Sequence, residues 1–365
     1  MLKRQRSTLV PVLIIALLLI GIQMAASAHG QAYYLTQLIM AAYYSIVVLG
    51  LCLVMGYCGQ VSMGHGAFFA IGGYTSAILT TTNIAAAKES YWGHALLEAH
   101  ILSFWQDPYG GQVLAVSPWA AFIIAMVLTV VIAVLIGYPA LRLKGHYLAM
   151  ATLGFGLIVY RLLLGSSFTG AADGITGVPG WTLTSHLILT SNNTYRVANY
   201  YFAWGVTLVI LVLLLNLVHS RVGRALRSIH DGDLAANAMG INTAGFKLQA
   251  FIISALLAAA AGSFLTHYTG GIGPSEAGAM KSVRYLVLVA AGGMANLWGG
   301  LIVSTILTFL SLRGCFGSYD HAVFGIILIT IVSIAPEGPL KPLNLWIRRA
   351  FNIVIPQRRY HHGSV

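Results

Sequence analysis

Long apolar runs, separated by short polar segments, follow one another along most of this chain. Six runs are nearly continuous, and four others are shorter or interrupted by glycine. A helix that spans a bilayer needs about 20 mainly apolar residues. The pattern therefore predicts an all-α, polytopic membrane protein with about ten transmembrane helices, some of them short, Gly-interrupted or re-entrant. The continuous runs are 9–26, 35–55, 120–140, 147–164, 201–218 and 248–267, and the weaker ones are 64–81, 283–294, 297–312 and 321–335.

Composition supports this interpretation. Of the 365 residues, 58% are hydrophobic and only 8% are charged, and the mean hydropathy is +0.81. A soluble domain carries about 25% charged residues, so this chain cannot cover a globule of its size with charge. The same figures exclude a disordered chain, a collagen and a disulfide-rich secreted fold. Cys52, Cys58 and Cys315 show neither a CxxC pair nor zinc-ligand spacing, which favours structural thiols.

The net charge of +11 fits membrane topology better than nucleic-acid binding, because the bases cluster at the ends of apolar runs. If all ten runs cross and the N-terminus is cytoplasmic, the cytoplasmic segments carry most of the 20 bases. This asymmetry predicts that both termini are cytoplasmic. The bases then left on the outer side are Lys88, Arg196, Lys281, Arg284 and Arg313, while Arg161 lies within a run.

The first run fits either a retained helix or a cleavable signal peptide, because bases precede it and Ala26-Ser27-Ala28 follows it. Its apolar stretch is long for a signal peptide, which favours the retained helix. We therefore expect an N-terminal transmembrane helix and outer link over 1–34, and a main transmembrane domain over 35–340. That domain contains a cytoplasmic loop at 219–247. A basic cytoplasmic tail, 341–365, is expected to lie along the lipid headgroups.

Residues 56–74 break the apolar pattern with several glycines and with Gln60, Ser62 and His65. In a membrane, irregular backbone persists only where protein or a water-filled cavity satisfies its polar groups. Interrupted helices of this kind line substrate paths in transporters. The alternative is close helix packing through small residues four positions apart. The candidate pathway residues of this segment are Gly59, Gln60, Gly64, His65, Gly66 and Phe68.

Two further glycine-interrupted stretches supply the other pathway candidates. Residues 144–156 contribute Thr152 and Gly154, and the outer segment 169–180 contributes Asp173 and Gly174. A lone Asp in such a loop is usually a turn former that accepts backbone N–H bonds. Both interpretations of Asp173 therefore stay open.

Residues 220–242 predict a short helix on the cytoplasmic side. Asp233 can start it and Gly240 can end it, with good helix formers between them. A helix with charge on one flank and small residues on the other suits docking to a soluble partner. The alternative is an ordinary basic loop that fixes topology.

Several catalytic motifs are absent from the sequence. It contains no GxxxxGK[ST] phosphate loop, no GxSxG and no HExxH. We predict that the chain is not an enzyme, with no catalytic residue, metal site or cofactor. An ion-coupled carrier usually shows an acid, or an acid–base pair, inside its spans, and none lies in the predicted runs. Energy for transport is therefore expected to come from another subunit.

Five segments, taken together and in order, resemble the permease subunits of branched-chain amino-acid ABC importers, in the LivM-type branch. They cover most of residues 35–340. Five ordered segments are far more specific than any one alone. The segments are GYCGQVSMGHGAFFAIGGY (56–74), YLAMATLGFG (147–156), TGAADGITGVP (169–179), GRALRSIHDGDLAANAMGINTAGFKL (223–248) and IAPEGPL (334–340).

The resemblance implies the ABC importer permease fold, in the bacterial cytoplasmic (inner) membrane. The implied partners are a second homologous permease, two cytoplasmic ABC ATPases, a periplasmic or extracellular solute-binding protein and the lipid bilayer, with no nucleic acid. It also implies that the 219–247 loop couples to the ATPase. ABC permeases often have Glu before the Ala pair of this loop, whereas this chain has Leu234 there, with Asp233 one place earlier. The implied coupling residues are Arg224, Arg227, Asp233, Ala235, Ala236 and Gly240.

The expected function is thus import of branched-chain or other hydrophobic amino acids. The chain departs from the family pattern at Met63, Ala171 and Ala172, and none of these changes identifies a solute. A urea or short-chain amide importer shares the same motifs and stays as an alternative. Alternatives of a different class are an ATPase-independent channel or secondary carrier, and a membrane scaffold or receptor.

Overall fold

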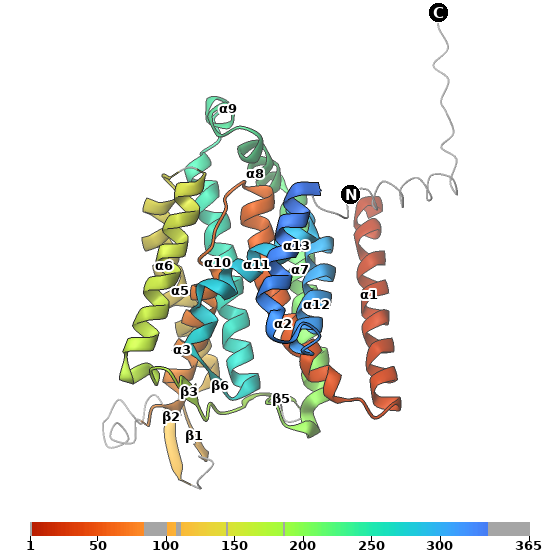
Figure 1. Cartoon of the computed structure of the whole chain (residues 1–365), viewed down its shortest axis with the longest axis vertical. Helices are drawn as coiled ribbons and strands as arrows, with labels where there is room; N and C mark the ends of the chain where they lie inside the picture. Colours follow the sequence, from red (N-terminus) through yellow and green to blue (C-terminus); the bar gives the residue numbers. More distant parts are fainter. Residues whose placement is uncertain (1, 84–100, 107–110, 144, 185–186, 335–365) are drawn as a thin grey trace, which may run out of the picture.

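The helices of the chain lie side by side in one bundle, with short strands gathered at one end (Figure 1). This computed structural model describes residues 2–83, 101–106, 111–143, 145–184 and 187–334. Among these, six helical segments are long and apolar enough to cross a membrane. The predicted helical, polytopic architecture is confirmed. The long helices are α1 (Leu2–Ala28), α2 (Tyr33–Cys52, continued by a π-helical turn, Leu53–Tyr57), α5 (Pro118–Ala140), α6 (His146–Gly165), α7 (Arg196–His219) and α10 (Thr243–Thr269).

The four weaker predicted spans are also helices, but each has only 14 to 17 residues. Such lengths fall short of the about 20 residues that a full span needs. The count of ten crossings therefore stays a prediction. The short helices are α3 (His65–Thr81), α11 (Ala279–Gly292), α12 (Leu297–Leu312) and α13 (Asp320–Ile334).

Helix α2 forms the centre of the bundle, whereas α1 stands at its edge (Figure 1). In α2, 94% of the most apolar window is buried, against 6% in α1. A helix that is apolar on all sides needs either a protein or a lipid surrounding on all sides. Helices α7, α10 and α12 surround α2, while lipid must solvate the exposed Leu13 and Leu17 of α1.

The two ends of the bundle differ. Helices α8 (Arg221–Asp231) and α9 (Asp233–Ala238) lie at one end, which we call the helical end, together with the start of α1 and the end of α13 (Figure 1). The opposite end, which we call the strand end, carries three antiparallel strand pairs. They are β1 (Leu102–Gln106) with β2 (Gln112–Val116), β3 (Ile175–Thr176) with β6 (Gly271–Ile272), and β4 (Trp181–Thr184) with β5 (Leu187–Leu189).

Helices α3 and α10 approach closely because glycines face backbone at their crossing. A Cβ atom built on Gly72 would lie 2.1 Å from the Ala259 carbonyl oxygen, and one on Gly262 would lie 2.0 Å from the Phe69 carbonyl oxygen. Small residues at such crossings are typical of membrane helix packing. Gly72 and Gly262 therefore serve close helix packing.

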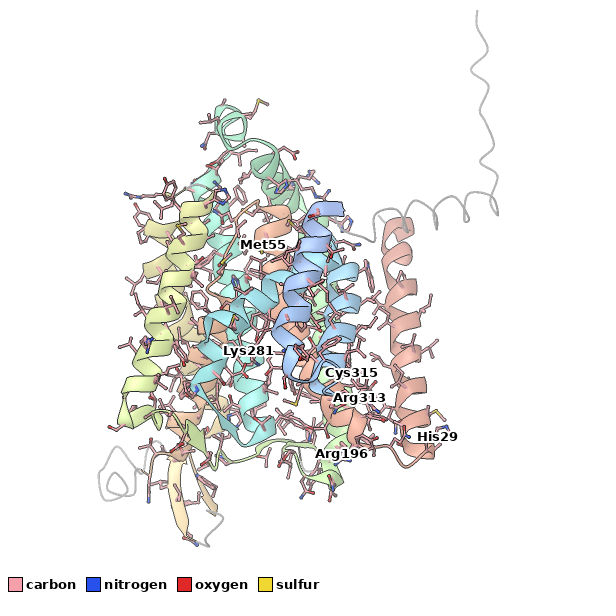
Figure 2. The ribbon with its side chains drawn as sticks, viewed as in Figure 1. His29, Met55, Arg196, Lys281, Arg313 and Cys315 are labelled. Carbon is pink, nitrogen blue, oxygen red and sulfur yellow. The ribbon has the colours of Figure 1, made fainter. Side chains whose placement is uncertain are left out.

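Two crossings are broken in the middle. In the first broken crossing, residues 58–64 are extended and α3 follows; in the second, residues 270–278 precede α11. The starts of the two helices touch, since the Gly66 N–H donates to Ser282 Oγ at 3.3 Å. Lys281 lies about midway along the bundle, between Met55 near the helical end and Arg196 near the strand end (Figure 2). The run 283–294 therefore covers only the half of the bundle that adjoins the helical end. Residues 335–340 of the last quoted segment, and the predicted tail, lie outside the described residues.

Candidate substrate path and coupling segment

The first broken crossing is extended because its backbone finds partners on other segments. Gly59 has a φ of +69°, a left-handed conformation that glycine adopts without strain. The Gln60 N–H donates to the Val54 carbonyl at 3.0 Å, and the Met63 N–H donates to Thr152 Oγ1 at 3.0 Å. Backbone groups inside a membrane need such partners. These bonds hold the segment extended within the bundle.

A pocket of about 240 Å³ lies between this segment and the helical end, with Gln60 on one wall and His230 and Lys247 on another. The Gln60 side chain is only 4% exposed, and its Oε1 has no hydrogen-bond partner among the described residues. A buried amide oxygen without a partner is costly unless a polar guest or water reaches it. The arrangement thus suits Gly59 and Gln60 as pocket-lining residues.

His65 and Phe68 brace the start of α3. The ring nitrogens of His65 lie 3.2 Å from Ser62 Oγ and 2.6 Å from Ser254 Oγ, so both are hydrogen-bonded. The Phe68 ring packs edge-on against Phe251, with centroids 5.6 Å apart. Both side chains are buried. They fasten α3 to α10 and present no free polar group.

Gly64 and Gly66 allow neighbours to approach the start of α3. A Cβ atom on Gly64 would lie 3.0 Å from the Thr152 carbonyl oxygen, and one on Gly66 would lie 2.7 Å from Ser282 Oγ. Thr152 itself is fully buried and accepts the Met63 N–H described above. These residues set the distance between α3, α6 and α11.

The remaining pathway candidates lie elsewhere. Gly154 borders an apolar groove of about 720 Å³ between α3, α5 and α6. Asp173 is exposed in a turn at the strand end. Gly174, with a φ of +69°, lets that turn approach β6, because a Cβ atom there would lie 2.2 Å from the Ile272 carbonyl oxygen. The ten predicted residues therefore fall into three places instead of one cluster.

Helix α8 packs on the bundle through one face. Gly223, Leu226 and Ile229, spaced three residues apart, are buried, while Arg224 is exposed. The Arg227 guanidinium donates to the Val218 carbonyl at 3.1 Å. The amphipathic pattern thus attaches α8 to the bundle and leaves its basic face outward.

Helix α9 divides its residues between the bundle and the outside. Asp233 Oδ2 accepts a hydrogen bond from Lys247 Nζ at 2.7 Å, so this acid forms an ion pair within the chain. Ala236 is only 3% exposed, whereas Leu234 and Met239 are 78% and 82% exposed. Ala236 packs against its own chain and Ala235 is exposed, and the implied coupling role of both residues stays a prediction.

Gly240 ends α9 with a φ of +80°. The Ile241 N–H donates to the Ala236 carbonyl at 3.1 Å, and the Gly240 N–H donates to the Asn237 carbonyl at 2.9 Å. This pair of bonds is the Schellman arrangement that glycine favours at a helix C-terminus. The predicted helix stop is thus found at Gly240.

A charged cluster at the second broken crossing was not predicted from the sequence. Lys281 and Arg284 were expected on the outer side, but Lys281 lies midway along the bundle (Figure 2). Lys281 Nζ donates to Glu276 Oε1 at 2.8 Å, and Arg284 Nη1 donates to Asp320 Oδ2 at 3.3 Å. In the sequence, Glu276, Lys281 and Arg284 interrupt the apolar pattern, which is typical of a loop outside the membrane. The signal that could have found them is the glycine content of 270–278, since glycines also interrupt 58–64.

Comparison with known proteins agrees with this architecture. The family model described as "Branched-chain amino acid transport system / permease component" matches residues 33–332. The high-affinity branched-chain amino acid transport system permease protein LivM of Escherichia coli is 30% identical over 319 residues, which cover 81% of this chain and 67% of that protein. LivM of Salmonella typhimurium is 29% identical, covering 82% of this chain and 68% of that protein.

The chain is also similar to the other permease of that system. LivH of Escherichia coli is 25% identical over 321 residues, which cover 84% of this chain and 96% of LivH. No solved structure matches the chain. The two kinds of relative indicate a permease that pairs with a second, homologous permease.

Proposed function

The chain belongs to the family of branched-chain amino acid transport permeases, and we propose that its own solutes are branched-chain or other hydrophobic amino acids. It is a multi-pass membrane protein and a permease subunit of an amino-acid importer, not an enzyme. The names of the LivM and LivH relatives support this choice of substrate.

The proposed assembly contains this chain, a second homologous permease, two cytoplasmic ABC ATPases and a periplasmic or extracellular solute-binding protein. It sits in the bacterial inner membrane with the helical end facing the cytoplasm. Residues 35–340 form the permease domain in this proposal, after an N-terminal helix and link over 1–34. The sequence has no phosphate loop, so the energy of ATP must reach it through a contact.

Helix α9 is the proposed contact. Leu234 and Met239 project outward at the helical end, where two exposed apolar side chains on a short helix suit a cleft on a soluble partner. The Schellman turn at Gly240 and the Asp233–Lys247 ion pair fix the position of α9 on α10. A displacement of α9 by its partner is therefore transmitted to the helix bundle.

One observation carries the proposal: helix α8, which leads into the proposed contact α9, touches the first broken crossing. A Cβ atom on Gly59 would lie 2.9 Å from His230 Nδ1 at the end of α8. The same pocket of about 240 Å³ is bordered by Gln60, His230 and Asp233. Movement of α8 and α9 should therefore shift the position of the extended segment 58–64. In this mechanism, ATP hydrolysis opens and closes a polar path beside Gln60.

The test is uptake by the complete complex in proteoliposomes. Radiolabelled leucine should accumulate only when ATP is inside with the ATPases and the binding protein is present on the other face. Unlabelled isoleucine and valine should compete, whereas urea and acetamide should not. Competition by urea or acetamide alone would overturn the proposed substrate class.

The secondary-carrier alternative has one observation in its favour, because the Glu276–Lys281 pair inside the bundle is the mark expected of such a carrier. Family membership favours the importer. Accumulation driven by a proton or sodium gradient without ATP would establish the carrier and contradict the proposal.

A further inference from the structure

The π-helical turn Leu53–Tyr57, at the end of α2, contacts α8 on one side and the turn between α11 and α12 on the other. All five of its residues are buried, and Met55 marks its place near the helical end (Figure 2). Single π-helical turns inside α-helices are rare and are frequently found at functional sites. This turn therefore connects the helical end to the centre of the bundle.

Two contacts fasten the π-helical turn to the α11–α12 turn. A Cβ atom on Gly56 would clash with the Met294 carbonyl oxygen, so glycine lets the two backbones lie directly against each other. Next to it, Tyr57 Oη donates to the Ala295 carbonyl at 2.7 Å, the usual length of an O–H···O bond. The end of α2 and the α11–α12 turn thus share one interface.

Helix α8 holds the other side of Tyr57. The Arg227 guanidinium carbon lies 5.7 Å from the centroid of the Tyr57 ring, which is within the distance of a cation–π interaction. The same guanidinium donates to the Val218 carbonyl at the end of α7. Tyr57 therefore has its ring against α8 and its hydroxyl on the α11–α12 turn, so that one side chain joins the two.

The α11–α12 turn is built to move as a unit. The Asn296 N–H donates to the Gly293 carbonyl at 2.8 Å, and Asn296 Oδ1 accepts the Gly299 N–H at 3.2 Å. A Cβ atom on Gly292 would lie 2.6 Å from the Gly300 Cα atom, so the adjoining ends of α11 and α12 are in close contact. Close-packed segments transmit a displacement instead of absorbing it.

The opposite end of α11 is held in place. Lys281 pairs there with Glu276 at 2.8 Å, and Ser282 accepts the Gly66 N–H. The 14 residues of α11 span about 21 Å. A displacement of the α11–α12 turn should therefore tilt α11 about its fixed start.

We propose that Tyr57 is a positioning residue for energy coupling, which transmits a displacement of α8 to the α11–α12 turn. The same displacement acts on 58–64 through His230. The parts of both broken crossings that adjoin the helical end then move together, while their junction at Gly66 and Ser282 stays in place. This inference rests on the proposed function and extends it to α11.

The first measurement is the number of leucine molecules imported per ATP hydrolysed by the complete complex in proteoliposomes. Tyr57→Phe keeps the ring beside Arg227 and removes only the bond to the Ala295 carbonyl. We expect this ratio to fall several-fold, with the KM for leucine unchanged. A loss of folded complex alone would lower uptake and hydrolysis equally, and it would leave the ratio unchanged.

Tyr200→Phe is the matched control. The buried Tyr200 Oη also donates to a backbone carbonyl, that of Leu19, at 3.1 Å, but it joins α7 to α1. Removing this hydroxyl should lower thermal stability as Tyr57→Phe does, while the ratio of leucine to ATP stays that of the unaltered complex. An equal fall of the ratio in both variants would overturn the specific role of Tyr57.

The second measurement follows the α11–α12 turn directly. The Ala295 side chain is exposed, so Ala295→Cys can be labelled by a thiol reagent from the cytoplasmic side in a complex with Cys58→Ser and Cys315→Ser. Its labelling rate should change several-fold when ATP and vanadate trap the ATPases. Tyr57→Phe should abolish that change and leave the nucleotide-free rate intact, whereas Tyr200→Phe should preserve the change.

The outcomes separate the two proposals. A normal ratio of leucine to ATP in Tyr57→Phe, or a nucleotide-dependent labelling rate at residue 295 that survives this substitution, would overturn the role of Tyr57. Because labelling needs no substrate, it tests that role independently of the solute. Failure of ATP-driven leucine uptake by the unaltered complex, with an active ATPase, would overturn the proposed function itself.

Discussion

The two broken crossings solve one physical problem with different residues. In each, a non-α-helical segment leads from one end of the bundle to a helix that starts inside it; the first is extended, and the second contains a 3-10 turn, Pro274–Ala277. The first, at 58–64, uses neutral groups: glycine backbone, Gln60 and the hydroxyl of Thr152. The second, at 270–278, places the charged pair Glu276–Lys281 beside its helix.

The difference between neutral and charged residues corresponds to the end of the bundle that each segment adjoins. The first adjoins the helical end, where α8 and α9 touch it, and it must move when they move. The second adjoins the strand end, where β6 fixes it by pairing with β3. Moving neutral groups as a path opens and closes costs less free energy, whereas buried charges need partners in fixed positions to offset the cost of their desolvation. We infer a mobile gate on the side of the helical end and a fixed segment on the side of the strand end.

The largest effect is expected at the point where the two crossings meet. Gly66→Val would place bulk 2.7 Å from Ser282 Oγ and 3.0 Å from the Glu276 carbonyl oxygen. We expect uptake to fall to background and stability to drop by about 1–3 kcal/mol, as for overpacking. Uptake and thermal unfolding of the complex measure both effects. Gly205→Val, where a Cβ atom meets nothing within 4 Å, is the matched control, and normal uptake in Gly66→Val would refute the shared junction.

The sequence predicted the first crossing well and the second poorly, for a physical reason. Gly59, Gln60 and His65 stand among apolar residues, so their interruption of a span is visible along the chain. Glu276 and Lys281 lie in a glycine-rich stretch without a long apolar run, and only their contact with Tyr44 of α2, far away in sequence, shows that they are inside. The sequence also does not reveal that Ala235 is exposed and Ala236 is buried. Which face of a short helix packs on its neighbour depends on the tertiary structure.

The next largest effect concerns coupling alone. Gly240→Glu forces a residue with a side chain into a φ of +80° and adds charge to the docking surface. The backbone strain costs about 1–2 kcal/mol, and the last turn of α9 should lose its position. We expect uptake to be lost while the permease still assembles in the membrane. ATPase activity of the complex should no longer rise with substrate, and stimulation equal to that of the unaltered complex would show that docking occurs elsewhere.

The neighbouring alanines sharpen this prediction. Ala235→Trp changes an exposed residue and should uncouple ATP hydrolysis without altering thermal stability. Ala236→Trp changes a residue that is 3% exposed, so it should uncouple hydrolysis and also lower the unfolding temperature. Equal stability of the two variants would contradict the assignment of faces on α9.

A smaller effect is expected where α8 touches the first broken crossing. Gly59→Ala brings a Cβ atom to 2.9 Å from His230 Nδ1, and it also strains a left-handed residue. We expect the maximal uptake rate to fall several-fold with little change in KM. His230→Ala in the same chain removes the clash but not the strain, so it should restore part of the rate. Additive losses in the double variant would contradict direct contact.

The smallest effect is expected for the ion pair that positions α9. Asp233→Asn breaks the pair with Lys247, whose side chains are 29% and 14% exposed respectively. Because water screens such partly exposed pairs, the loss should be about 1 kcal/mol or less. Uptake should fall less than in Gly240→Glu, and its dependence on salt concentration should become weaker. An effect as large as that of Gly240→Glu would mean that Asp233 binds the ATPase directly.

The mobile gate itself can be measured by the accessibility of residue 60. In a complex with Cys58→Ser and Gln60→Cys, a membrane-impermeant thiol reagent on the cytoplasmic side should react at a rate that changes several-fold when ATP and vanadate trap the ATPases. Gly240→Glu should abolish that change while leaving the nucleotide-free rate intact. A labelling rate at residue 60 that is the same with and without trapped nucleotide would contradict the coupling of α9 to the first broken crossing.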